Sequence, residues 1–110
     1  DYLKKKQLPW AEAKAFNGSA VVGDWVEFDD RAAYELSING NQVQKGSLKE
    51  MSWSADELIS KLADWAPIRE GDILFTGTPS GVGPLNTGDK VTASLYIDDE
   101  LVSTHSATCV

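Results

Sequence analysis

The residues best suited to chemistry lie in one stretch, residues 77–84, which contains three glycines and two prolines in eight positions. Glycine and proline at this density impose an unusual backbone path. Such a loop can direct backbone N–H groups and the hydroxyls of Thr76, Thr78 and Ser80 toward one point, where an anion or an enolate oxygen would bind. A plain wide turn between two strands is the alternative on composition alone.

Lys14 is the second candidate, because it lies between small and aromatic neighbours in the run Ala13-Lys14-Ala15-Phe16. A lysine among apolar groups can lose its charge or pair with a carboxylate beside a metal. An ordinary surface lysine is the simpler interpretation. The single histidine, His105, falls in an expected strand, and the single cysteine, Cys109, stands next to the last residue, so we interpret both as non-catalytic.

The common catalytic and nucleotide-binding motifs are absent. The chain has no HExxH, no CxxC and no GxSxG motif. Gly77 and Gly81 are not followed by the Gly-Lys-Ser/Thr ending that a P-loop requires. The segment around Gly83 leads into a turn and a strand, whereas a dinucleotide fingerprint opens a helix.

These candidates must be positioned by a mostly antiparallel sheet with one main helix. Asn39-Gly40 between two short extended runs predicts a hairpin over residues 32–46, since both central turn residues need a positive φ. A second pair of strands is expected over residues 90–97 and 100–108, joined at Asp98-Asp99. The apolar run 73–76 is typical of a short buried strand. We therefore expect an α+β fold with five or six strands.

The main helix is expected over residues 55–65. Ser54 and Glu57 have the spacing of a capping box. Leu58, Leu62 and Trp65 then recur at helical spacing, and Pro67 ends the run. We expect these three side chains to face the sheet.

Composition excludes several classes of protein. With 10 Lys+Arg against 17 Asp+Glu, the net charge of −7 argues against a nucleic-acid partner. No apolar run approaches the roughly 20 residues of a membrane span. One cysteine cannot form an internal disulfide. We expect a soluble, cytoplasmic single domain over residues 1–110, without a nucleic-acid or membrane partner.

Several segments together resemble the fumarylacetoacetate hydrolase family, closest to its small acylpyruvase and oxaloacetate decarboxylase-like members. The specific match is residues 71–84, and the supporting matches are Leu8-Pro9-Trp10, residues 13–16, Ile38-Asn39-Gly40 with Gln44, and Gly88-Asp89. Family members are about twice as long, so the chain resembles their C-terminal half.

The resemblance implies a mixed β-roll fold and a dimeric enzyme. Such an enzyme would act on 2-oxo acids, in pathways such as aromatic catabolism. One Mg²⁺ or Mn²⁺, held by two glutamates and an aspartate, would stabilise the enolate formed on C–C hydrolysis or decarboxylation. Lys14 and Thr78 match catalytic residues. Thr76 and Gly77 would shape the substrate pocket with Thr78, and Gly18 would lie near the metal.

The chain also departs from the family pattern. The Glu-x-Glu pair is absent, and the aspartate ligand is expected upstream of Asp1. We therefore expect the 110 residues alone to be inactive. Two alternatives stay open: an isomerase or hydratase acting on oxo-dienoates with the same fold, and a non-catalytic binding or oligomerisation module.

Overall fold

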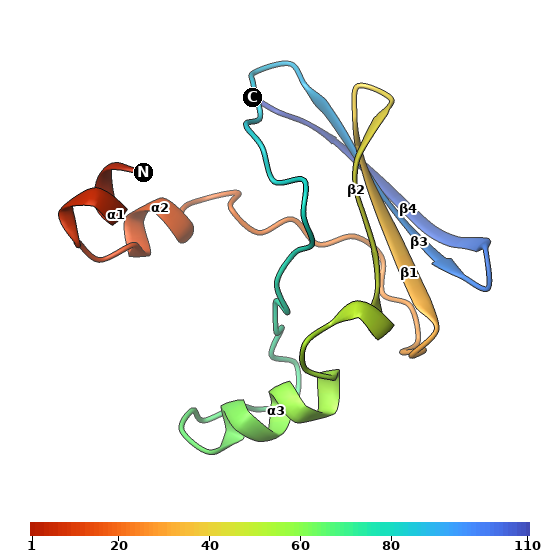
Figure 1. Ribbon diagram of the computed structural model, residues 1–110, viewed down its shortest axis with the longest axis horizontal. Helices are drawn as coiled ribbons and strands as arrows, with labels where there is room; N and C mark the ends of the chain where they lie inside the picture. The colour runs from red at the N-terminus through yellow and green to blue at the C-terminus, as the bar shows by residue number, and fades with distance from the viewer.

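The computed structural model describes all 110 residues and has one antiparallel sheet of four strands. The strands are β1 (Ala32–Ile38), β2 (Asn41–Ser47), β3 (Lys90–Ile97) and β4 (Glu100–Thr108). Their order in the sheet is β2-β1-β3-β4, so β2 and β4 form the two edges (Figure 1). The α+β class with a mostly antiparallel sheet is confirmed.

Both expected hairpins are present, and their turns have the same geometry. Asn39 and Gly40 have φ values of 51° and 83°, and Asp98 and Asp99 have φ values of 51° and 64°. Positive φ at both central positions gives a turn whose twist matches the right-handed twist of the flanking strands. The residue types at these two turns therefore predicted the positions of both hairpins correctly.

The sheet has one apolar face and one polar face. On the apolar face, Tyr34 and Leu36 of β1 lie opposite Leu95 and Ala93 of β3. On the polar face, hydroxyls pair across β3 and β4, with Thr92 Oγ1 and Ser106 Oγ 2.9 Å apart. On the apolar face Ala32 is buried, most other side chains of β1 and β3 are half-buried, and Ala93 is exposed. The chain therefore does not enclose a core by itself.

The main helix, α3 (Ala55–Ala63), is shorter than expected and does not cover the sheet. Ser54 caps it by accepting a 3.2 Å hydrogen bond from the Glu57 N–H. It lies beyond the end of β2, separated from it by the 3-10 helix η1 (Leu48–Glu50) (Figure 1). Trp65 follows the helix and is 78% exposed, so the expected packing of α3 on the sheet is wrong.

The expected strand over residues 73–76 is also wrong. These residues belong to no strand, and the Phe75 side chain is 64% exposed. An extended apolar segment becomes a strand only where a neighbouring backbone accepts its hydrogen bonds. No strand of this chain lies beside residues 73–76 in that way, so the sheet has four strands instead of five or six.

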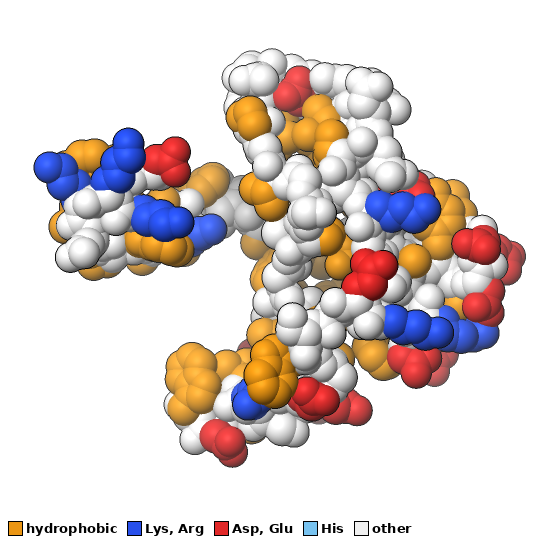
Figure 2. Space-filling model, in the orientation of Figure 1, with side chains coloured by type: hydrophobic (Ala, Val, Ile, Leu, Met, Phe, Trp, Pro, Cys, Tyr) orange, Lys and Arg blue, Asp and Glu red, His pale blue; other side chains and the backbone are white.

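The N-terminal residues extend away from the sheet. Helices α1 (Tyr2–Lys6) and α2 (Ala11–Lys14) form an arm on one side of the molecule (Figure 1). None of the helices is long and apolar enough to cross a membrane. The accessible surface is 9132 Å², against about 6,000 Å² for a compact protein of this mass. The excess consists in part of apolar side chains, which are visible around α3 and the centre of Figure 2.

Candidate functional site

A cleft of about 310 Å³ lies where the β1–β2 hairpin ends and meets η1, the start of α3 and residues 76–79. This volume is at the small end of the range for ligand pockets, about 300–1,000 Å³. Apolar side chains and hydroxyls share its walls, which are formed by Tyr34, Ser47, Leu48, Glu50, Met51, Ser52, Trp53, Leu58, Thr76, Gly77, Thr78 and Pro79.

The glycine-rich loop supplies one wall of this cleft. Thr76, Gly77 and Thr78, the three expected substrate-binding residues, all line it. The loop is tied to β2 by Gln44, whose Nε2 donates to Thr78 Oγ1 and to the Pro79 carbonyl, each at 2.9 Å. The structure therefore brings these threonines to a cleft, and their contact with substrate stays a prediction.

Gly81 lets the loop lie directly against β2. A Cβ atom at this position would stand 2.0 Å from the Val43 carbonyl oxygen, and the Gly81 φ of +105° also disfavours any other residue. The backbone of the loop at Gly81 therefore packs directly against the backbone of β2 at Val43, beside the Gln44 side chain.

Several other residues of the cleft lining are restrained by local contacts. The Tyr34 ring lies over Gly46, where a Cβ would come within 3.0 Å of the tyrosine oxygen. Glu50 Oε2 accepts from the Ser47 N–H at 3.4 Å and thereby caps η1. Lys61 Nζ lies 4.1 Å from the centre of the Trp53 ring, a cation–π contact that restrains this tryptophan.

Lys14 and Gly18 do not line the cleft. Lys14 is the last residue of α2, on the N-terminal arm that Figure 1 shows apart from η1 and α3. Gly18, with a φ of 81°, lies in the tight turn after α2, where the Ser19 N–H donates to the Phe16 carbonyl at 2.9 Å. Of the expected site residues, Thr76, Gly77 and Thr78 therefore line the cleft, whereas Lys14 and Gly18 do not.

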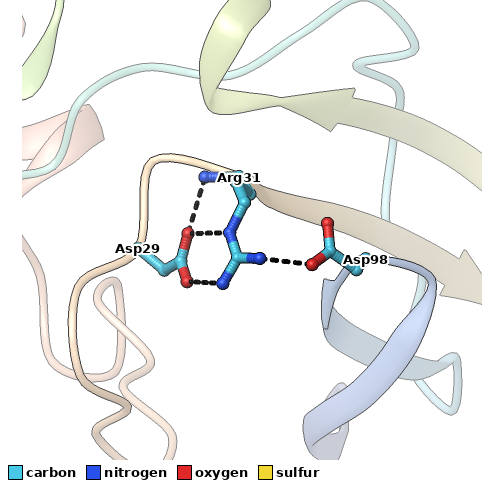
Figure 3. Close-up of polar contacts among 3 residues, drawn as sticks. All are labelled: Asp29, Arg31 and Asp98. Carbon is cyan, nitrogen blue, oxygen red and sulfur yellow. Dashed lines mark hydrogen bonds and ion pairs between the residues drawn. The ribbon is translucent and has the colours of Figure 1, made fainter.

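The strongest charge cluster lies outside the cleft, around Arg31 (Figure 3). The Arg31 guanidinium forms ion pairs with Asp29 and Asp98 and so links the start of β1 to the β3–β4 turn. Hydrogen bonds from the Arg31 side chain and backbone, with its positive charge, lower the pKa of Asp29 to about 2. These carboxylates are already partnered, so the cluster is a structural clamp.

The residues present do not fit a complete site for a divalent metal. A hard cation such as Mg²⁺ takes oxygen ligands, several of them usually carboxylates. No group of three His, Cys, Asp or Glu side chains could hold a metal ion, and Glu50 is the one carboxylate that lines the cleft. A metal bound to a set of carboxylates therefore needs ligands from outside these 110 residues.

Sequence comparison with known proteins identifies the family of this chain. The sequence model of the fumarylacetoacetate (FAA) hydrolase C-terminal family matches residues 1–106. The chain is 36% identical over 98 residues to the oxaloacetate tautomerase YcgM of Escherichia coli, covering 84% of this chain and 45% of that protein. It is also 36% identical to the human mitochondrial oxaloacetate tautomerase FAHD1, covering 87% of this chain and 46% of that protein.

Solved structures agree. The yeast protein ynq8, described as a fumarylacetoacetate hydrolase family protein, superposes with a TM-score of 0.92 at 28% identity, over 99% of this chain and 49% of that one. Fumarylpyruvate hydrolase from Pseudomonas aeruginosa, solved with Mn²⁺ and pyruvate, superposes with a TM-score of 0.86 at 30% identity, over 99% and 47%.

The chain therefore belongs to the fumarylacetoacetate hydrolase family of enzymes, as its motifs indicated. It spans about half the length of the curated relatives that it matches.

Two features of the site escaped the sequence analysis. Gln44 was noted only as part of the family resemblance, and its contact with Thr78 joins residues 34 positions apart. Tyr34 and Trp53 line the cleft although neither belongs to a functional motif. The sequence offered one signal for Tyr34, namely the glycine at position 46. A glycine within a strand often marks a place where another group packs closely against the backbone, and here that group is the Tyr34 ring.

Proposed function

We propose that this chain forms the part of a fumarylacetoacetate hydrolase family enzyme that holds the oxygen atoms of a 2-oxo acid. The observation that carries the proposal is the position of Thr78. Its side chain lines the cleft while a partner from β2 restrains the loop. The proposed substrates are oxaloacetate and acylpyruvates, whose carboxylate and carbonyl oxygens accept hydrogen bonds.

The proposed reaction is C–C hydrolysis or decarboxylation. In oxaloacetate decarboxylation the bond to the distal carboxyl group breaks, carbon dioxide leaves, and the electron pair moves toward the 2-oxo oxygen as an enolate. A proton then adds to the carbon to give pyruvate. Donors aimed at that oxygen lower the barrier, because negative charge grows there. The Thr78 hydroxyl would serve as such a donor, and the Lys14 ammonium would add positive charge in the complete fold.

Tautomerisation is the second candidate, because the curated relatives named above are oxaloacetate tautomerases. It moves one proton between the carbon and the 2-oxo oxygen without breaking a C–C bond. The same enolate, and therefore the same hydrogen-bond donors, would serve both reactions.

A divalent ion, Mg²⁺ or Mn²⁺, is part of the proposal for the complete enzyme. The Mn²⁺ in the Pseudomonas aeruginosa relative supports it. The ligands would come from the half of the fold that the relatives have in addition to the matched half. We also propose that the complete enzyme is a homodimer, which the large exposed apolar area of this chain supports.

The test compares Thr78→Val with Ser80→Ala in the complete enzyme. Ser80 lies in the same loop and does not line the cleft, so its variant is the matched control. With oxaloacetate, loss of the enol absorbance without pyruvate indicates tautomerisation, and release of pyruvate indicates decarboxylation. We expect Thr78→Val to lower kcat/KM at least tenfold and Ser80→Ala to have little effect. Equal activity of the two variants, or no reaction with any 2-oxo acid, would overturn the proposal.

A further inference from the structure

Gln44 has a defined relationship to the candidate site although it does not line the cleft. We propose that Gln44 is a positioning residue, which determines the direction in which the Thr78 hydroxyl donates its hydrogen. The inference deepens the proposed function and rests on it for the identity of the acceptor, a substrate oxygen.

The orientation of the Gln44 amide follows from its two partners. The Pro79 carbonyl lies 2.9 Å from the amide nitrogen and can only accept a hydrogen bond. The group facing it must therefore be the NH₂ group and not the amide oxygen. The second hydrogen of that NH₂ group points to Thr78 Oγ1, also at 2.9 Å.

This geometry decides what Thr78 can offer to a ligand. A threonine hydroxyl carries one hydrogen and two acceptor lone pairs. Because the atom of Gln44 that faces Oγ1 is a donor, the Thr78 hydrogen cannot point toward Gln44. It is left free for the cleft, where it suits the carboxylate or carbonyl oxygen of a 2-oxo acid.

The backbone of β2 places Gln44 for this role. Leu36 pairs with Gln44 and Ser37 with Gln42, so Val43 is an extra residue at a β-bulge. Bulges bend an edge strand and redirect the neighbouring side chain. The Val43 carbonyl is the same group that leaves no room for a Cβ at Gly81. Bulge and glycine together bring loop and strand into contact beside the Gln44 amide.

The contact joins segments that are distant in sequence. The chain after residue 76, drawn in teal, runs beside β2 in Figure 1, and the hydrogen bonds of Gln44 connect the two. Without the Gln44 amide, the Thr78 hydroxyl is free to rotate, and a fraction of its orientations no longer donate into the cleft.

A measurement on the complete enzyme without ligand tests the geometry. In ¹⁵N-labelled protein, we expect the two side-chain amide hydrogens of Gln44 to be shifted downfield and slow to exchange. Thr78→Val should change only the hydrogen that faces Oγ1 and leave the one bonded to Pro79 unchanged. Gln42, an exposed residue of the same strand without a bond to the loop, is the internal control. Gln44 hydrogens that behave like those of Gln42 would overturn the inference.

A kinetic measurement on the complete enzyme tests the role. We expect Gln44→Leu to lower kcat/KM for oxaloacetate about fivefold, the effect of one ordinary hydrogen bond. Gln42→Leu should leave it unchanged. In a Thr78→Val background, Gln44→Leu should cause no further loss, because its effect passes through the hydroxyl. A loss that simply adds to that of Thr78→Val would show a general structural role and overturn the inference.

The two measurements separate this inference from the proposed function. If the complete enzyme acts on no 2-oxo acid, the proposed function fails, together with the identity of the acceptor. The amide measurement still decides whether Gln44 orients Thr78.

Discussion

Asn39 and Asp89 join the turn of the first hairpin to the start of β3, 50 residues further along the chain. Asn39 Nδ2 donates to Asp89 Oδ1 at 2.9 Å, and Asn39 Oδ1 accepts from the Lys90 N–H at 2.9 Å. Hydrogen bonds from the Asn86 backbone and from the Asn39 side chain lower the pKa of Asp89. Asn39 therefore does more than adopt the positive φ that its turn requires.

Asn39→Gly removes both hydrogen bonds and keeps a residue that accepts the φ of 51°. We expect the free energy of unfolding to fall by at least about 1 kcal/mol, the typical value of the one neutral hydrogen bond to Lys90. Urea unfolding measures the change. Asn41→Gly is the control, since Asn41 is an exposed residue directly after the same turn. An equal effect of the two substitutions would show that Asn39 acts through its backbone alone.

Asp29 gives a pH dependence with a definite sign. Its pKa is about 2 in the folded chain against an ordinary value of 3.8. A lowered carboxyl pKa stabilises the fold above about pH 4, and this stabilisation is lost as the pH falls toward 2. We expect Arg31→Gln to return the Asp29 pKa toward 3.8, as measured by ¹³C NMR of the carboxyl carbon. Arg69→Gln is the control and should leave the Asp29 pKa unchanged, because Arg69 does not contribute to the lowering of that pKa.

Trp65 tests how much of the apolar surface is uncovered. With 78% of the residue exposed, Trp65→Ser should change the free energy of unfolding of this chain by less than about 0.5 kcal/mol. Trp53→Ser should cost more, because Trp53 lines the cleft and contacts Lys61. Thermal unfolding compares the two variants. A large loss at Trp65 would mean that another part of the chain, or a second copy, covers it.

Metal binding separates this chain from the complete enzyme. Since no three ligating side chains come together, we expect isothermal titration of the 110 residues with Mg²⁺ or Mn²⁺ to show only weak, non-stoichiometric binding. The isolated chain should also turn over neither oxaloacetate nor acylpyruvates. Stoichiometric micromolar binding would place a metal site within these residues.

Lys14 stays a predicted catalytic residue, and its test belongs to the complete enzyme. There, Lys14→Ala should lower kcat/KM at least a hundredfold with little loss of stability, because the ammonium would act on charge that develops in the transition state. Lys4→Ala, on the exposed surface of α1, is the control. Lys14 and Thr78 should then lie within about 10 Å of each other, the length of a small ligand cleft. If the Lys14→Ala enzyme turned over substrate at the wild-type rate, Lys14 would be an ordinary surface lysine without a catalytic role.

The sequence by itself determined the features that depend on a few adjacent residues. Asn39-Gly40 and Asp98-Asp99 determine two hairpins because only a few residue types accept a positive φ at low cost. Ser54 determines where α3 begins, since it satisfies a backbone N–H that the helix leaves free. The family motif around Thr78 is equally local, and it identified a loop that lines the cleft.

Only the tertiary structure decided the relationships that need a partner from elsewhere. Residues 73–76 have the composition of a strand, yet a strand exists only where another backbone completes its hydrogen bonds. Trp65 has the spacing of a core residue, but it follows the end of α3 and is 78% exposed in this chain. The bond between Gln44 and Thr78 shows the converse case. No local pattern indicates it, because it forms only when a bulged edge strand and a glycine-rich loop meet in space.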